Sequence, residues 1–315
     1  MKPTVPNVIY RMHARRAIAR NRGTIMLIAL LSTLFLLLSQ AFLQMGMNRD
    51  ANALITLLSG VSDGSLTNAG LVTLTDRILA AGKNDLLIAG GCVLAWVLTA
   101  FLSTGRTAAE LKLIRGQEIT IADALSRGAI WHKAIAHRLY LIFRIVLWMV
   151  PGFALMMLGQ FLAVRRALAN GGILDETALM MASMFQLQGM AGMFFLSAWA
   201  YLRYSMSGII LADRPETGVL ESVRLSKAFV KGRLRRLILM ALTFLAGLMV
   251  ASWFTSSLTL ASPVLGLVVD MAITLFILLY YDTTLCVFYL DQLAAQAQEV
   301  EGTVEKSPLS EETEP

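Results

Sequence analysis

The sequence predicts an all-α, polytopic membrane protein, a bundle of about six transmembrane helices. Hydrophobic residues make up 57% of the 315-residue chain, charged residues 15%, and the mean hydropathy is +0.65, whereas roughly 25% of residues in soluble domains are charged. Between Leu237 and Leu290 only Asp270 and Asp282 carry charge, over a length that can cross a bilayer twice. These runs are continuous rather than alternating, which favours helices over a β-barrel because a helix satisfies its own backbone hydrogen bonds.

The expected spans follow from the apolar runs along the chain. Four further stretches lack any Lys, Arg, Asp or Glu: Thr24–Asn48, Leu86–Gly105, Ile145–Val164 and Thr177–Leu202. We expect spans at about 24–46, 86–105, 139–163, 190–212, 237–257 and 264–289. Ser256–Pro263 contains turn residues and no charge, which predicts a tight turn. Thr177–Gln188 is interpreted as an interfacial helix before the fourth span, with a broken part of that span as the alternative.

Three regions follow from charge and hydropathy. Residues 1–23 form a basic amphipathic arm, residues 24–293 the six-span membrane domain, and residues 294–315 an acidic tail that we expect to be disordered. Lys and Arg number 20 in the arm, the tail and alternate connections, against 5 in the other connections. By the positive-inside rule, the arm, the tail and both termini are cytoplasmic. The first apolar run is too long for a signal-peptide core, so we expect it to remain as an uncleaved anchor.

The charge and the cysteines limit the partners. The net charge of +6 lies in the predicted cytoplasmic segments with little aromatic interleaving, which favours anionic inner-leaflet lipid over nucleic acid. Membrane lipids are therefore the expected partners, and no protein partner is indicated. Cys92 and Cys286 fall in different predicted spans, toward opposite faces of the membrane, so no disulfide framework is expected.

A short repeated string suggests internal symmetry. Residues 16–20, 133–137 and 227–231 each read basic, Ala, bulky apolar, small or branched apolar, basic, and each leads into an odd-numbered span. We interpret them as three two-span pseudo-repeats, each preceded by an interfacial amphipathic helix. The alternative is that any positive-inside junction has this composition. Small residues recur at every fourth position through Gly91, Ala95, Thr99 and Ser103, and again at Gly247 and Ala251. Such stripes favour close helix packing within the bundle or, less so, at a homodimer face.

Several short motifs carry a family resemblance. Ser226–Arg233 (SKAFVKGR), the Pro151-Gly152 pair, and Tyr281–Thr284 leading to Phe288-Tyr289 together resemble an uncharacterised bacterial integral-membrane family called domain of unknown function 975. That family is similar to the membrane domain attached to some glycerophosphodiester phosphodiesterases. The resemblance covers roughly residues 106–293 and implies a membrane fold in the bacterial cytoplasmic membrane. It brings no catalytic residues.

The residues give little sign of catalysis. His13, His132 and His137 lie in basic segments without carboxylates or cysteines at metal-ligand spacing, and no nucleophile elbow, phosphate-binding loop or zinc-binding helix motif occurs. We therefore expect no enzyme activity, no cofactor, no metal and no catalytic residue.

Ionisable residues inside the predicted spans are the candidate site. Arg203 and Asp282 lie at similar depth on two parallel spans, and Arg144 lies slightly shallower on a third. A lone buried charge costs at least ~2.5–3.5 kcal/mol in a bilayer, so we expect Arg203 and Asp282 to pair directly or through Tyr204 or Tyr281. This predicted polar cluster, near the inner leaflet, is either a structural ion pair or a binding site for an anionic headgroup or solute.

Three classes of function stay open. The first is a non-enzymatic membrane protein that interacts with lipid or acts as a membrane-embedded partner. The alternative is a small transporter or channel for an anionic solute or lipid, which the charged cluster and the repeats suggest. An intramembrane enzyme acting on lipid ranks third, because it would need a water-accessible acid, base or metal cluster.

Overall fold

The computed structural model describes residues 6–35, 68–170 and 175–304, and within these ranges every regular element is helical. Five helices are long and apolar enough to cross a membrane: Ile88–Ile114, Ile121–Ala169, Glu176–Asp213, Leu234–Leu258 and Val268–Gln298. A sixth candidate is the pair Asn7–Arg20 and Arg22–Phe35, which is bent by 100°. The predicted all-α bundle with about six spans is confirmed.

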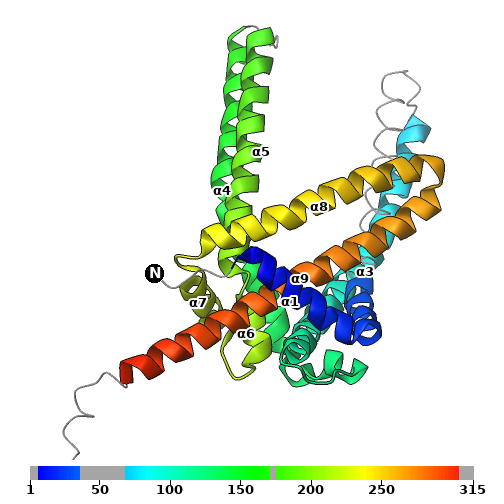
Figure 1. Ribbon diagram of the computed structural model, residues 1–315. Coiled ribbons are helices and arrows are strands. Elements are labelled where there is room, and N and C mark those ends of the chain that lie inside the picture. Colours follow the sequence, from blue (N-terminus) through cyan, green and yellow to red (C-terminus); the bar gives the residue numbers. More distant parts are fainter. Residues whose placement is uncertain (1–5, 36–67, 171–174, 305–315) are drawn as a thin grey trace, which may run out of the picture.

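Helix α1 (Asn7–Arg20) belongs to the core and is not a separate arm. Its buried residues Tyr10, Ala14 and Ile18 recur every fourth position and form one stripe. The Tyr10 hydroxyl donates to Asp291 Oδ2 at 2.8 Å, and the Tyr280 hydroxyl donates to the Arg11 carbonyl at 2.9 Å. These bonds hold α1 against α9 (Pro263–Val304) (Figure 1). The first predicted span begins in the helix Arg22–Phe35, and its remainder lies outside the described residues.

Helix α3 (Asn68–Ile114) extends beyond the predicted span 86–105 at both ends. After α3 the chain turns through Gly116, whose φ of +80° favours glycine, into the short helices η1 (Ile121–Leu125) and η2 (Gly128–Ile130). A Cβ on Gly105 would lie 1.8 Å from the Ala124 carbonyl oxygen, so α3 and η1 touch through their backbones. The last turns of α3 thereby carry Arg106 and Glu110 on a helix, where the sequence predicted a connection.

Helices α4 (Trp131–Ala169) and α5 (Glu176–Tyr204) form a long antiparallel hairpin that projects from the rest of the molecule (Figure 1). A Cβ on Gly152 would lie 2.7 Å from the Gly189 carbonyl oxygen, and one on Gly159 would lie 2.2 Å from Phe185 Cβ. These glycines let α5 pack directly on α4, and α5 runs without a break from Glu176 to Tyr204. The predicted interfacial helix at 177–188 is therefore wrong, and the fourth span begins earlier than residue 190.

The chain then forms α6 (Ser207–Asp213), α7 (Val219–Val230), α8 (Leu234–Ala261) and α9. Gly232 has a φ of +81°, which allows the turn from α7 into α8. Helix α8 continues to Ala261, so the turn into α9 is shorter than the predicted 256–263. Helix α9 continues to Val304, which corrects the predicted disorder for residues 294–304. Residues 305–315 of the predicted tail lie outside the described residues.

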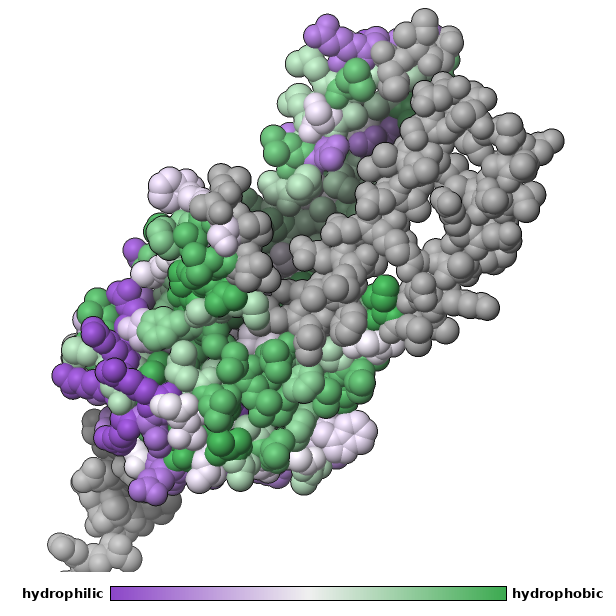
Figure 2. Space-filling model, turned by 90° about the vertical axis from the view of Figure 1, so that its right-hand side faces the viewer, coloured by the Kyte–Doolittle hydropathy of each residue, from purple (hydrophilic) through white to green (hydrophobic). Residues whose placement is uncertain are grey.

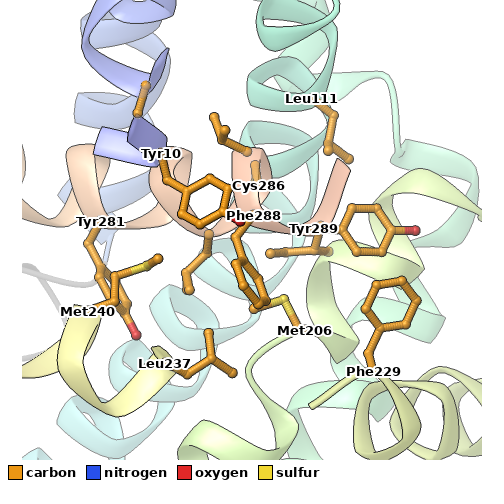
Figure 3. Packing of buried hydrophobic residues seen from close by; sticks show 14 of the residues in the cluster. Tyr10, Leu111, Met206, Phe229, Leu237, Met240, Tyr281, Cys286, Phe288 and Tyr289 are labelled. Carbon is orange, nitrogen blue, oxygen red and sulfur yellow. The ribbon is translucent and has the colours of Figure 1, made fainter. Parts of the chain in front are cut away.

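The main apolar core lies where α1, α3, α6, α7, α8 and α9 meet, a region called here the base of the bundle (Figure 3). Its members include Tyr10, Leu111, Met206, Phe288 and Tyr289. The Tyr10 and Phe288 rings meet edge to face with centroids 5.5 Å apart.

Away from the base, large apolar side chains are exposed on the spans, for example Phe195 at 68% and Trp253 at 75%. On the face in Figure 2, hydrophobic residues cover much of the surface and hydrophilic residues gather toward its edges. Such a surface suits contact with lipid.

The repeated basic strings do not share one structural setting. Residues 16–20 end α1, and residues 227–231 comprise the last turn of α7 and the residue after it, so in both places a helix precedes a span. Residues 133–137 instead lie in the first turns of α4, after η1 and η2. Before the third span the helical segments are short, the helices η1 and η2, so the three strings do not begin matching units. The stripe at Ala95 and Thr99 is buried, but a Cβ on Gly247 would meet nothing within 4 Å, so this glycine is not a close helix contact within the described chain.

Candidate functional site

The structure divides the predicted polar cluster among different surroundings. Asp282 on α9 and Tyr204 at the end of α5 line the same cavity, while Arg203 lines a second one. The Tyr281 ring lies in the core, with its centroid 5.1 Å from that of Phe244. These four residues therefore do not form one site.

Arg144 lies apart from both cavities. Its Nε donates to the Tyr140 hydroxyl at 2.8 Å, and its guanidinium carbon lies 5.1 Å from the centroid of the Tyr140 ring. Both residues are on α4, one helical turn apart, so the contact is local. The aromatic ring and hydroxyl give this cation a partner on its own helix.

The predicted ion pair between Arg203 and Asp282 is wrong, because Asp282 pairs with Arg106 on α3. The same guanidinium lies 3.4 Å from Glu110, measured from Arg106 Nε to Glu110 Oε1. We call Arg106, Glu110 and Asp282 the ionic cluster. The Cys286 thiol also donates to Glu110 Oε2 at 3.6 Å.

Arg106 and Glu110 were missed because the charge-free run ends at Gly105, which made them look like part of a connection. Their spacing of four residues was the available signal, since an Arg and a Glu so spaced share one face of a helix. Extension of α3 by about two turns places this face against α9.

A cavity of about 250 Å³ adjoins the ionic cluster. It lies among α3, α4, α5, α6 and α9, and we call it the ionic cavity. Its polar lining is Ser103, Thr104, Thr107, Glu110, His137, Arg138, Tyr201, Tyr204, Ser205 and Asp282. Leu141 and Ile145 add an apolar wall along α4. Tyr201 is half exposed, so the cavity has a side that opens at the surface of α5.

Arg138 is the cation in this cavity that lacks a carboxylate partner within the described chain. Its one hydrogen bond there runs from Nη2 to Ser103 Oγ at 3.4 Å. Arg106, in contrast, is matched by two carboxylates. The charges of Arg106, Arg138, Glu110 and Asp282 balance formally. Within the described chain Arg138 forms no ion pair, but Asp282 attracts it across the cavity.

His137 has a defined orientation beside Arg138. Its Nε2 lies 2.8 Å from Ser207 Oγ, and the Ser207 hydroxyl donates to the Tyr204 carbonyl at 2.6 Å. A hydroxyl has one proton, so Ser207 Oγ accepts from His137 Nε2–H. In the neutral imidazole, Nδ1 is then an acceptor.

A second cavity, of about 540 Å³, lies among α5, α7 and the start of α8. We call it the basic pocket. Its lining is Trp199, Arg203, Lys227, Ala228, Val230, Lys231, Gly232 and Leu234, which includes three cations and no Asp or Glu. Lys227 Nζ lies 5.6 Å from the centroid of the Tyr204 ring, so Tyr204 stands between the two cavities.

The local sequence explains how the basic pocket is built. In the stretch Ser226–Gly232, Ser226, Phe229 and Val230 are buried while the lysines face the pocket. The Ser226 hydroxyl donates to the Arg203 carbonyl at 3.1 Å and ties α7 to α5.

Among the described residues, no group of three or more His, Cys, Asp or Glu side chains is arranged to hold a metal ion.

The fold and the apolar helices define the class: a multi-pass α-helical protein with the spans of a membrane protein. A family model described as protein of unknown function, DUF975, matches residues 38–296. The chain therefore belongs to the DUF975 family. No curated protein and no solved structure matches the chain.

Proposed function

We propose that the protein is a non-enzymatic membrane protein that binds an anionic lipid headgroup in the basic pocket, at the inner leaflet of the bacterial cytoplasmic membrane. The observation that carries the proposal is the set of three cations, Arg203, Lys227 and Lys231, around one pocket whose lining has no carboxylate. Basic pockets between spanning helices suit phosphate headgroups. Trp199, at 44% exposure, borders the pocket, and Trp side chains favour the membrane interface.

Lipid binding is tested by mass spectrometry of the purified protein in detergent after exchange into phosphatidylglycerol and phosphatidylcholine. We expect the native chain to retain phosphatidylglycerol preferentially. Replacing Lys227 and Lys231 by Gln should reduce that retention about tenfold. Arg214 and Arg224 are exposed basic residues outside the pocket lining, and the matched control replaces both by Gln, which should leave retention unchanged. If both double variants lose phosphatidylglycerol retention equally, general surface charge retains the lipid, and the proposed lipid site in the basic pocket is wrong.

The second candidate is a small transporter or channel for an anionic solute or lipid. The observation that favours it is the ionic cavity, because charged residues within spanning helices often mark a solute pathway. Uptake of labelled solute into vesicles that contain the protein would test it, and the Arg138→Gln variant should abolish uptake. The similarity to the membrane domain of glycerophosphodiester phosphodiesterases stays a prediction, and it is compatible with a glycerophospholipid ligand.

A further inference from the structure

The basic pocket carries more positive charge than a single phosphodiester balances. Arg203, Lys227 and Lys231 line it, and its lining has no Asp or Glu. None of these cations forms an ion pair within the described chain, and Lys227 lies instead over the Tyr204 ring. The phosphodiester of phosphatidylglycerol has one negative charge. Such a headgroup would therefore leave two of the cations without a counter-charge.

The cations come from two walls of the pocket. Arg203 lies at the end of α5, whereas Lys227 and Lys231 lie one helical turn apart at the end of α7. The hydrogen bond from Ser226 to the Arg203 carbonyl joins the two walls. A guanidinium binds a phosphate through paired N–H donors, and an ammonium binds it as a point charge. The pocket thus offers two positions for phosphate, one on each wall.

The size of the pocket agrees with a headgroup that has more than one phosphate. A volume of about 540 Å³ corresponds to roughly eighteen water molecules at about 30 Å³ each. A single phosphate would leave most of that space to water, whereas two phosphates joined by glycerol have room to reach both walls.

Apolar side chains continue from the pocket along two spans. On α5, Trp199 lines the pocket, and Phe195, one turn before it, is exposed. On α8, Leu234 lines the pocket, and Leu242, about two turns further on, is exposed. Away from the base, α8 diverges from the α4–α5 hairpin (Figure 1). The described helices therefore leave these residues accessible to the acyl chains of a bound lipid.

We propose that the basic pocket binds a phospholipid with two phosphates joined by glycerol, which is the chemistry of cardiolipin. One phosphate lies on Arg203 and the other on the two lysines, and the acyl chains lie against α5 and α8. Basic pockets between spanning helices suit headgroups of this kind. The inference rests on the proposed function, because it names the class of lipid that the same pocket selects.

Competition between lipids tests the inference. The full chain in detergent is exchanged into an equimolar mixture of cardiolipin, phosphatidic acid and phosphatidylglycerol, and mass spectrometry measures the lipid that stays bound. We expect about tenfold more cardiolipin than phosphatidylglycerol, because a second phosphate adds charge-assisted hydrogen bonds. Phosphatidic acid, whose single phosphate can carry a second charge, should be retained less than cardiolipin. Cardiolipin that lacks one acyl chain should be retained like the intact lipid, and excess glycerol 3-phosphate should displace neither.

Variants of Arg203 separate the two walls. Arg203→Gln should abolish the preference for cardiolipin over phosphatidylglycerol, because only the lysine wall remains to bind phosphate. Arg224→Gln, which changes an exposed cation on α7 outside the pocket lining, is the matched control and should leave the preference unchanged. Arg203→Lys keeps the charge without the paired donors, and it replaces Arg203→Gln if that variant does not fold. It should lower the preference only partly.

Four results would overturn the two-phosphate site. They are equal retention of cardiolipin and phosphatidylglycerol, equal retention of cardiolipin and phosphatidic acid, an unchanged preference in the Arg203 variant, and loss of the preference when one acyl chain is removed. Displacement by glycerol 3-phosphate would assign the pocket to a soluble phosphate instead.

Failure of this inference is distinguishable from failure of the proposed function. If the lysine variants lose phosphatidylglycerol but the native chain does not prefer cardiolipin, the pocket binds anionic lipid and only the two-phosphate site is wrong. If the native chain retains no anionic lipid above phosphatidylcholine, both are wrong.

Discussion

Arg106 contacts two carboxylates from two helices, Glu110 one turn along α3 and Asp282 on α9. Its side chain is 13% exposed, and that of Glu110 is fully buried. Removing Arg106 would leave two partly or fully buried carboxylates without their cation, whereas removing Asp282 leaves Arg106 with Glu110. The arrangement of charges therefore predicts that removing Arg106 lowers the stability of the protein more than removing Asp282.

The first prediction is that Arg106→Gln destabilises the protein more than Asp282→Asn. Breaking a buried pair costs roughly 3–5 kcal/mol, so we expect about 3 kcal/mol for Arg106→Gln and less for Asp282→Asn. Thermal unfolding in detergent measures both. The Arg106→Gln, Asp282→Asn double variant should recover part of the loss. Arg203→Gln combined with Asp282→Asn serves as the control and should give additive losses, since these residues are not paired; recovery there would contradict the observed pairing.

The second prediction concerns Asp175, which lies directly before the candidate span Glu176–Asp213. It caps α5 by accepting the Ala178 backbone N–H at 2.8 Å and also accepts from Arg166 at 2.9 Å. Chiefly the Ala178 N–H, and then Arg166, hold the pKa of Asp175 below its usual range. A carboxylate whose pKa is lowered by folding stabilises the folded protein at pH values above its unfolded-state pKa, about 3.9. This stabilisation is lost as the pH falls through the folded-state pKa.

Asp175→Ala should therefore lower the melting temperature at pH 6, and its difference from the native chain should shrink as the pH falls below about 3.9. Glu176→Ala, which removes the neighbouring exposed carboxylate, is the matched control and should show a smaller effect at pH 6. A difference that stays constant across the pH range would mean that the charge of Asp175 does not support the cap.

At the scale of elements, the α4–α5 hairpin depends on glycine. A Cβ on Gly152 would lie 2.6 Å from the Met193 backbone nitrogen and 2.7 Å from the Gly189 carbonyl oxygen. Both neighbours are backbone atoms, so the helices must separate to accept it. Gly247 on α8 is also inside a helix but has open space around it.

The third prediction is that Gly152→Ala destabilises the hairpin although alanine is the better helix former. Overpacking costs typically about 1–3 kcal/mol, which exceeds the gain of about 1 kcal/mol from helix propensity. Gly247→Ala should be neutral or slightly stabilising. Thermal unfolding of both variants decides this, and equal effects would mean that the contact at Gly152 does not limit the spacing of α4 and α5.

The sequence was sufficient to predict the spans because an apolar run must form a helix in lipid. It was insufficient for helix ends, because hydropathy marks where the bilayer ends and helices continue past it. Arg106 and the α9 residues after Leu290 were misjudged for this reason. The need of Asp282 for a partner was predicted correctly, but the identity of the partner depends on how α3 meets α9. Side-by-side packing of two distant segments leaves no periodic signal in either one.

At the scale of the whole molecule, the apolar spans project from a base that carries both polar cavities. The helix pair α5 and α6 forms one candidate span, Glu176–Asp213, and α9 contributes Val268–Gln298. If these helices cross a bilayer, Thr177 lies on one side and Glu216 on the other. The excess of Lys and Arg near Glu216 predicts that this side is cytoplasmic.

The last prediction uses single cysteines at the exposed positions Thr177, Glu216 and Gln298, with Cys92 and Cys286 replaced by Ser. In intact cells an impermeant thiol reagent should label the cysteine at 177 and spare those at 216 and 298. All three should react after permeabilisation, which is the control for access. The reversed pattern would show that the termini face outward. Labelling of all three in intact cells would show that α5, α6 and α9 do not separate these positions across a membrane, and the assignment of the basic pocket to the inner leaflet would fail with it.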